Sequence, residues 1–123
     1  MEPNVALASA GALFIRHMHF QKTGDREFEH SHNFDHMTLL VKGSLDVKAK
    51  GKTTRFVAGP AGQIIYIKAD TLHELTALED DTVACCIHAL RDKRNPENLL
   101  DASMIPEGVD AERFAAPLIK DRV

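Results

Sequence analysis

Short apolar stretches, each ended by a turn-forming residue, dominate this chain and leave no room for a helix of ordinary length. They run from about Leu13 to Leu90, with Gly, Asp or Pro in the breaks between them. Such spacing is typical of an all-β sandwich or barrel, because each stretch suffices for one strand and each break supports a tight turn. The predicted strands span 13–21, 27–32, 36–42, 44–50, 53–58, 63–68, 73–78 and 82–90.

The chain of 123 residues is long enough for one domain with a single core. We expect residues 1–91 to form a β-barrel, any N-terminal strand or strands included. Residues 92–123 differ in composition and are expected to form a C-terminal extension of short helices or turns. The stretches "HMTLLV" and "QIIYI" are apolar on both faces. One face should therefore line the barrel, while the other packs against the extension or a second copy of the chain.

Charge and cysteine usage limit the partners and the compartment. The formal net charge is -3 with both signs spread along the chain, so the basic patch that binds nucleic acid or an anionic membrane is missing. Cys85 and Cys86 are adjacent, and neighbouring strand residues point to opposite faces, so both are expected to be free thiols. The N-terminal "ASA" resembles a cleavage site, but no Lys or Arg precedes it. We therefore expect a cytoplasmic protein with no nucleic-acid or membrane partner.

Three of the seven histidines lie close together, at His30, His32 and His36. His30 and His32 share one face of a strand, because side chains two residues apart point the same way. The turn "NFD" would return His36 on the next strand, and His73 begins a later strand after a turn. Neutral imidazoles that converge on one point bind divalent transition metals such as Fe, Mn, Ni, Cu or Zn. The sequence therefore predicts one such ion per chain, held by these four histidines.

Other interpretations of the histidines stay open. The four side chains could be hydrogen-bonded barrel histidines that hold no metal, or His36 could point away and leave three ligands. Tyr66 and His88 are weak candidates for catalytic residues, since each lies in a predicted strand near the cluster. A packed aromatic side chain and a satisfied core histidine are the plainer interpretations of these two.

The spacing of these residues resembles that of the cupin family. Its first motif runs G-x5-H-x-H-x3/4-E-x6-G, and its second runs G-x5-P-x-G-x2-H-x3-N. The matching residues are Gly24, His30, His32 and Gly43 in the first motif and Gly62 and His73 in the second. The resemblance covers about 13–90, and it implies a single-domain jelly-roll β-barrel, a metal inside the barrel mouth and commonly a homodimer.

The chain departs from both motifs. His36 stands where the first motif has Glu, and Lys68, Asp70 and Ala77 stand where the second has Pro, Gly and Asn. Four neutral histidines leave a divalent ion its full charge, which favours an anionic ligand such as a carboxylate or enolate. Four protein ligands leave positions open on six-coordinate Fe, Mn or Ni, whereas they close a tetrahedral Zn site.

Two classes of function fit such a site. The first, which we favour, is an enzyme: a mononuclear-metal oxidoreductase of the dioxygenase type that acts on a small anionic or enolisable molecule. The second is non-redox, either a small-molecule binding or sensing protein or a Lewis-acid isomerase or lyase. It draws support from the lack of a visible general base beside the histidines. In either case the ligand would lie in an apolar barrel lined by Phe34, Leu40, Ile65 and Ile67.

Overall fold

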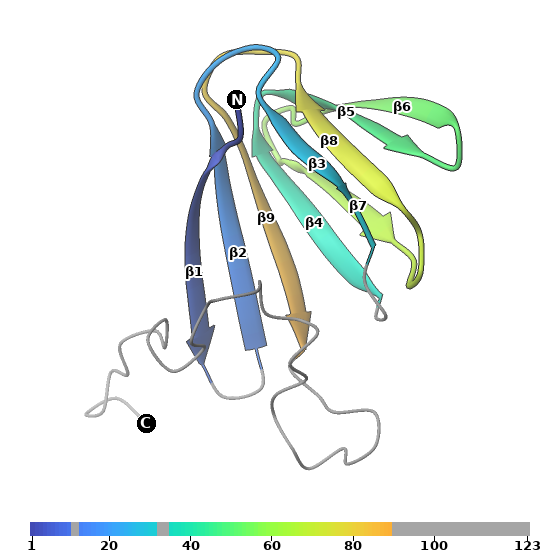
Figure 1. Cartoon of the computed structure of the whole chain (residues 1–123). Helices are drawn as coiled ribbons and strands as arrows, with labels where there is room; N and C mark the ends of the chain where they lie inside the picture. The colour runs from blue at the N-terminus through green and yellow to red at the C-terminus, as the bar shows by residue number, and fades with distance from the viewer. Residues whose placement is uncertain (11–12, 32–34, 90–123) are drawn as a thin grey trace, which may run out of the picture.

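The structure is a computed structural model that describes residues 1–10, 13–31 and 35–89. Within these ranges the chain forms nine strands in two antiparallel sheets (Figure 1). The same residues contain no helix long and apolar enough to cross a bilayer. The strands are β1 (Asn4–Ala10), β2 (Leu13–Phe20), β3 (Arg26–His30), β4 (His36–Lys42), β5 (Ser44–Ala49), β6 (Lys52–Val57), β7 (Gln63–Ile67), β8 (His73–Ala77) and β9 (Thr82–Ala89).

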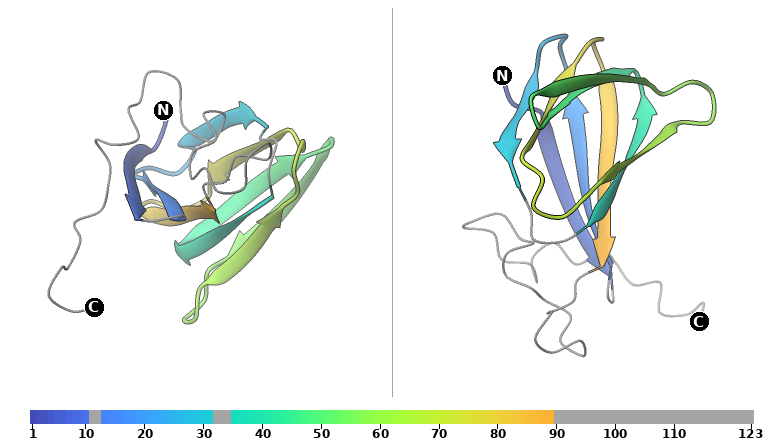
Figure 2. Two further views of the ribbon diagram at one scale, coloured as in Figure 1. Left: turned by 90° about the horizontal axis from the view of Figure 1, so that it is seen from below. Right: turned by 90° about the vertical axis from the view of Figure 1, so that its right-hand side faces the viewer.

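The two sheets face each other and curve around a common interior (Figure 2). One sheet has the strand order β1-β2-β9-β4-β7, and the other has the order β3-β8-β5-β6. Apolar side chains from both sheets fill the space between them, as expected of a jelly-roll barrel. The core includes Met18, Phe20, Leu40, Leu45, Val47, Ile65, Ile67 and Leu75.

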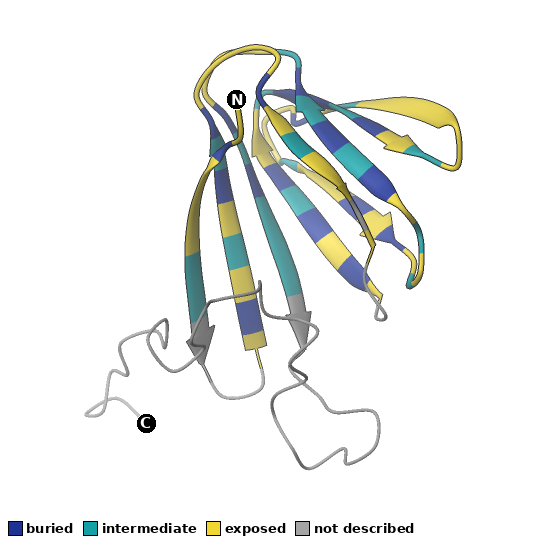
Figure 3. Ribbon diagram, in the orientation of Figure 1, coloured by how far each residue is buried: buried dark blue, intermediate teal, exposed yellow. Residues whose placement is uncertain are grey.

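Burial alternates along the central strands, and this alternation fixes which side chains reach the interior (Figure 3). On β4 the side chains of His36, Thr38 and Leu40 are buried, while those of Met37 and Val41 are exposed. β8 shows the same period of two, beginning with a buried His73. Each of these strands therefore delivers a histidine to the inner face at its first residue.

All eight predicted strands are present, with ends that agree to within one or two residues. β1 is an additional strand, which the expected barrel of 1–91 allowed for without placing it. It pairs along its whole length with β2 and forms one edge of the five-stranded sheet. The C-terminal extension predicted for 92–123 lies outside the described residues.

A one-residue turn joins β4 to β5, which are interior strands of the two sheets. Gly43 makes this turn with a φ of +86°, a conformation that side chains with a Cβ rarely adopt. The backbone also passes close to Thr82 at the start of β9, so that a Cβ on Gly43 would lie 2.3 Å from the Thr82 hydroxyl oxygen. Gly43, the second glycine of the first cupin motif, is therefore required by both conformation and space.

The pairing of β3 with β8 contains a β-bulge. Glu27 pairs with Leu75, and His30 pairs with His73, so three steps along β3 match two along β8. One extra residue is accommodated on β3, at the edge of the four-stranded sheet.

The outer face of the five-stranded sheet is apolar, as the two-faced stretches predicted. The paired strands place Met37 of β4 between Tyr66 of β7 and Ile87 of β9 on this face. Soluble monomers rarely expose contiguous apolar patches such as this face. Its exposed members are Leu13, Ile15, Met37, Val41, Ile64 and Tyr66.

Candidate metal centre

Two of the four predicted ligands lie together inside the barrel. His36 begins β4 in one sheet and His73 begins β8 in the other, and their side chains are only 4% and 2% exposed. Their ring centroids are 5.7 Å apart, with the ring planes tilted by 45°. His36 therefore points towards His73 in the barrel interior.

This separation suits two ligands of one ion. An imidazole nitrogen binds a transition metal at about 2.0–2.1 Å, so two rings on one ion have centres roughly 4.5–6 Å apart. The observed 5.7 Å falls in that range. The pair thus fits the predicted metal in spacing as well as in donor type.

A hydrogen bond sets the tautomer of His73. Its Nδ1 lies 2.8 Å from the carbonyl oxygen of Thr71. Because a carbonyl only accepts, Nδ1 must carry the proton, which leaves the lone pair of a neutral ring on Nε2. Histidine ligands are commonly oriented in this way, with one nitrogen donating to the backbone and the other available to the metal.

Asp35 connects the segments that carry the two histidines. Its Oδ1 accepts a hydrogen bond from the backbone N–H of Ala69 at 2.7 Å, in the turn that leads to β8. Its carboxylate also accepts the hydroxyl of Tyr66, and this hydrogen bond raises the pKa of the tyrosine. Tyr66 is 61% exposed. In this structure the tyrosine, a weak catalytic candidate, supports the loop beside the histidine pair through Asp35.

The remaining candidates are described only in part. The backbone register places His30 directly opposite His73, and it pairs His88 of β9 with Phe14 of β2. His32 lies outside the described residues. Among the side chains that the structure describes, no group of three or more His, Cys, Asp or Glu could hold a metal. The complete four-histidine set therefore stays a prediction.

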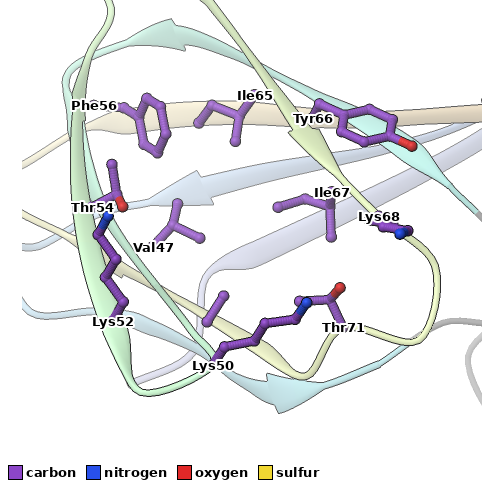
Figure 4. Close-up of a pocket in the computed structure, with 11 residues that line it drawn as sticks. Val47, Lys50, Lys52, Thr54, Phe56, Ile65, Tyr66, Ile67, Lys68 and Thr71 are labelled. Atoms are coloured by element: carbon purple, nitrogen blue, oxygen red, sulfur yellow. The ribbon is translucent and has the colours of Figure 1, made fainter.

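A pocket of about 290 Å³ opens beside the histidine pair, between β5 and β6 on one side and β7 on the other (Figure 4). Ile67, the strand partner of His36, lines it, and so does Ala49, the strand partner of His73. Thr71, whose carbonyl holds His73, lies on the same wall. Of the residues predicted to line the barrel, Leu40, Ile65 and Ile67 all lie in its core, and Ile65 and Ile67 also line this pocket. Phe34 lies outside the described residues.

The interior also holds an ion pair that the sequence analysis missed. Arg16 alternates with Phe14 and Met18 on the inner face of β2, and its guanidinium contacts the carboxylate of Glu27 in the opposite sheet. The two side chains are 23% and 12% exposed. Glu27 pairs with Leu75, which is two residues along β8 from His73. Two strand residues span about 7 Å, so Glu27 lies one layer of the interior away from His73. Strict alternation from Phe14 was the signal that would have located Arg16.

Cys86 lies in the same interior layer as this ion pair, as the strand partner of Arg16 and Thr38. Its Sγ is 3.4 Å from the hydroxyl oxygen of Thr38. Burial raises the pKa of the Cys86 thiol. The thiol therefore stays protonated at neutral pH and is a poor nucleophile.

We expect the Arg16–Glu27 pair to be sensitive to the loss of one partner alone. Arg16→Met should lower the free energy of unfolding by about 2 kcal/mol, because it leaves a largely buried carboxylate without its cation. Arg16→Met combined with Glu27→Leu should recover most of this loss. Urea denaturation measures both, with Arg55→Met as a control in the exposed Arg55–Asp46 pair. A double variant no more stable than the single one would contradict the prediction.

Comparison with known proteins identifies the fold. No protein-family model matches the chain, and no curated protein matches its sequence. Solved structures do match. KdgF from Halomonas sp. is 22% identical, with 74% of this chain and 79% of that chain covered at a TM-score of 0.59. An RmlC-like cupin with a double-stranded β-helix fold from Methanocaldococcus jannaschii is 13% identical, with 71% and 81% covered at a TM-score of 0.58.

A third similar structure is an uncharacterised conserved protein with a double-stranded β-helix domain from Klebsiella pneumoniae. It is 18% identical, with 80% of each chain covered at a TM-score of 0.61. The chain therefore has the double-stranded β-helix fold of the cupins, as the spacing of its glycines and histidines predicted.

Proposed function

From this cupin fold and its buried histidine pair, we propose that the chain is a metal-dependent enzyme acting on a small anionic or enolisable molecule. Its most concrete form is a mononuclear-metal oxidoreductase of the dioxygenase type. His30, His32, His36 and His73 would hold one Fe, Mn, Ni, Cu or Zn ion. The observation that carries the proposal is the approach of His36 to His73 at 5.7 Å, with Nδ1 of His73 committed to the Thr71 carbonyl.

The bound ion would supply a Lewis acid and, if it is redox-active, a site for O₂ chemistry. The protein orients the histidine ligands and provides apolar surroundings. Thr71 fixes the ring of His73, and Asp35 holds the turn before it to the start of β4. The side chains of Ile65 and Ile67 give the adjacent pocket an apolar wall.

A non-redox reaction is the second candidate, and Glu27 favours it. The sequence showed no general base beside the histidines, and this counted in favour of the non-redox class. The structure instead places the Glu27 carboxylate inside the barrel, one layer from His73, which within that class favours an isomerase or lyase over a binding protein. As a carboxylate inside the barrel, Glu27 would be the candidate general base for an enolisable substrate. A Lewis-acid isomerase or lyase would use the metal and this carboxylate together.

The expected homodimer also remains a proposal. The apolar outer face of the five-stranded sheet supports it, since a second copy would cover Met37, Val41 and Ile64. The cytoplasmic location is a proposal too, and the free thiols of Cys85 and Cys86 are consistent with a reducing compartment.

Metal content and O₂ uptake test the proposed function. We expect untagged protein purified without chelator to carry Fe, Mn, Ni or Cu near one per chain by inductively coupled plasma mass spectrometry. The His73→Ala variant should lose it. An Fe(II)-loaded sample should then consume O₂ with diketones, thiols or phenols. Metal without O₂ uptake would favour the isomerase or lyase, whereas no metal even after reconstitution would overturn both enzyme proposals.

A further inference from the structure

Three lysines surround the pocket beside the histidine pair. Lys50 lies in the turn between β5 and β6, Lys52 is the first residue of β6, and Lys68 follows the end of β7. Figure 4 shows the Lys50 side chain extending towards Thr71 along the edge of the pocket. None of the eleven residues that line the pocket is acidic. In a chain of net charge -3, this concentrates positive charge at one opening.

The lysines are not used in ion pairs within the described part of the chain. The ion pairs found there involve Arg16, Arg26 and Arg55, together with Lys22, His19 and the N-terminus. Lys50 also adopts a φ of +52°, followed by Gly51 at +73°, in a two-residue hairpin turn. Asn, Asp or Gly is the usual first residue of such a turn. A lysine held there despite its strained backbone suggests a functional reason for its side chain.

The floor of the pocket is apolar. Val47, Phe56, Ile65 and Ile67 supply most of it, and the volume of about 290 Å³ is near the lower end for small-molecule sites. Such a floor suits a small planar or branched hydrocarbon body and offers little to a polyol. Together with the lysines, it matches a molecule with an apolar body and one or more carboxylates.

We propose that this pocket binds an apolar carboxylic acid, with its hydrocarbon body on the floor and its carboxylate among Lys50, Lys52 and Lys68. Ile67 and Ala49 line the pocket and are the strand partners of His36 and His73, so a bound acid would lie next to the strands that carry the histidine pair. That the acid is the substrate rests on the proposed function, whereas its binding does not require a metal.

Two probes of equal shape test the proposal: 2-naphthoate, which is an anion, and 2-naphthamide, which is neutral. Isothermal titration calorimetry measures the binding of each probe to the whole chain, before and after a chelator has removed any metal. We expect 2-naphthoate to bind in both states. The variant Lys50→Gln/Lys52→Gln/Lys68→Gln should weaken that binding at least tenfold and change 2-naphthamide binding less than twofold. A matched control is Lys42→Gln/Lys48→Gln, because these two lysines are exposed and lie outside the pocket.

Each outcome decides the proposal. Naphthoate binding that the triple variant weakens and the control variant does not would support it, even in a protein found to hold no metal. In that case the proposed acid-binding pocket is supported, although the proposed metal-dependent enzyme is overturned. Binding that requires metal and is unchanged in the triple variant would overturn the proposal, since the metal alone would then hold the anion. Failure of naphthoate to bind in either state would also overturn it.

Discussion

His36→Ala should release the metal while the protein stays folded. Removing one of four imidazole ligands should raise the dissociation constant of the ion at least about 100-fold, more than the loss of an outer hydrogen-bond partner usually costs. His36→Glu should retain the metal, because a carboxylate supplies a donor at the position where the first cupin motif has Glu. Metal titration gives the dissociation constant of the ion, and mass spectrometry gives the metal content, for the unmodified protein and the two His36 variants.

The matched control for His36 is His17→Ala, since His17 is an exposed histidine on the outer face of β2. It should bind metal as the unmodified protein does. Circular dichroism without metal should show that all the variants keep their strands. Unchanged metal content in His36→Ala would exclude His36 as a ligand and leave at most three histidines in the set.

Gly43→Ala should be the most destabilising glycine-to-alanine change among the described glycines. The backbone φ of +86° costs a residue with a Cβ about 1–2 kcal/mol. The new methyl group would lie 2.3 Å from the Oγ1 of the fully buried Thr82, and such overpacking costs about 1–3 kcal/mol more. We therefore expect the free energy of unfolding to fall by about 3 kcal/mol or more, measured by urea denaturation.

Gly51→Ala separates the two contributions. Gly51 has a similar φ of +73°, but no atom lies within 4 Å of the added Cβ. Its loss of stability should therefore stay near about 1–2 kcal/mol, from backbone strain alone. Equal shifts of the two denaturation midpoints would show that Thr82 moves aside without cost, and that the close approach at Gly43 does not matter.

The strands were predictable from sequence because period-two burial and turn residues agree along most of the barrel. "HMTLLVK" and the Gly43 break that follows it gave the bounds of β4 without error. β1 was missed because "NVALASA" lacks the large alternating side chains that mark a strand, and its stability comes from pairing with β2. Local pattern therefore sufficed where the strand is central, and failed at an edge where a neighbour decides the structure.

The site was predictable only in part. The first positions of β4 and β8 follow from local alternation, so His36 and His73 could be assigned to the interior. Glu27 could not, because the bulge in β3 changes the parity between it and His30, and a bulge leaves no clear mark in the sequence. The three pocket lysines could not be predicted either, because Lys50 and Lys68 line one pocket only once β5, β6 and β7 are assembled.

The bulge in β3 decides which residue of β3 is the strand partner of His73. A regular ladder continued from the Glu27–Leu75 pair would bring Glu29 opposite His73, where the bulge now places His30. Straightening β3 at constant length would thus make Glu29, in place of His30, the strand partner of His73 without any substitution. Shortening the strand by one residue at 28–29 would remove the bulge and leave the histidine in place. Insertions and deletions in an edge strand are therefore a route by which a barrel of this kind can change which residue pairs with a buried position of the neighbouring strand.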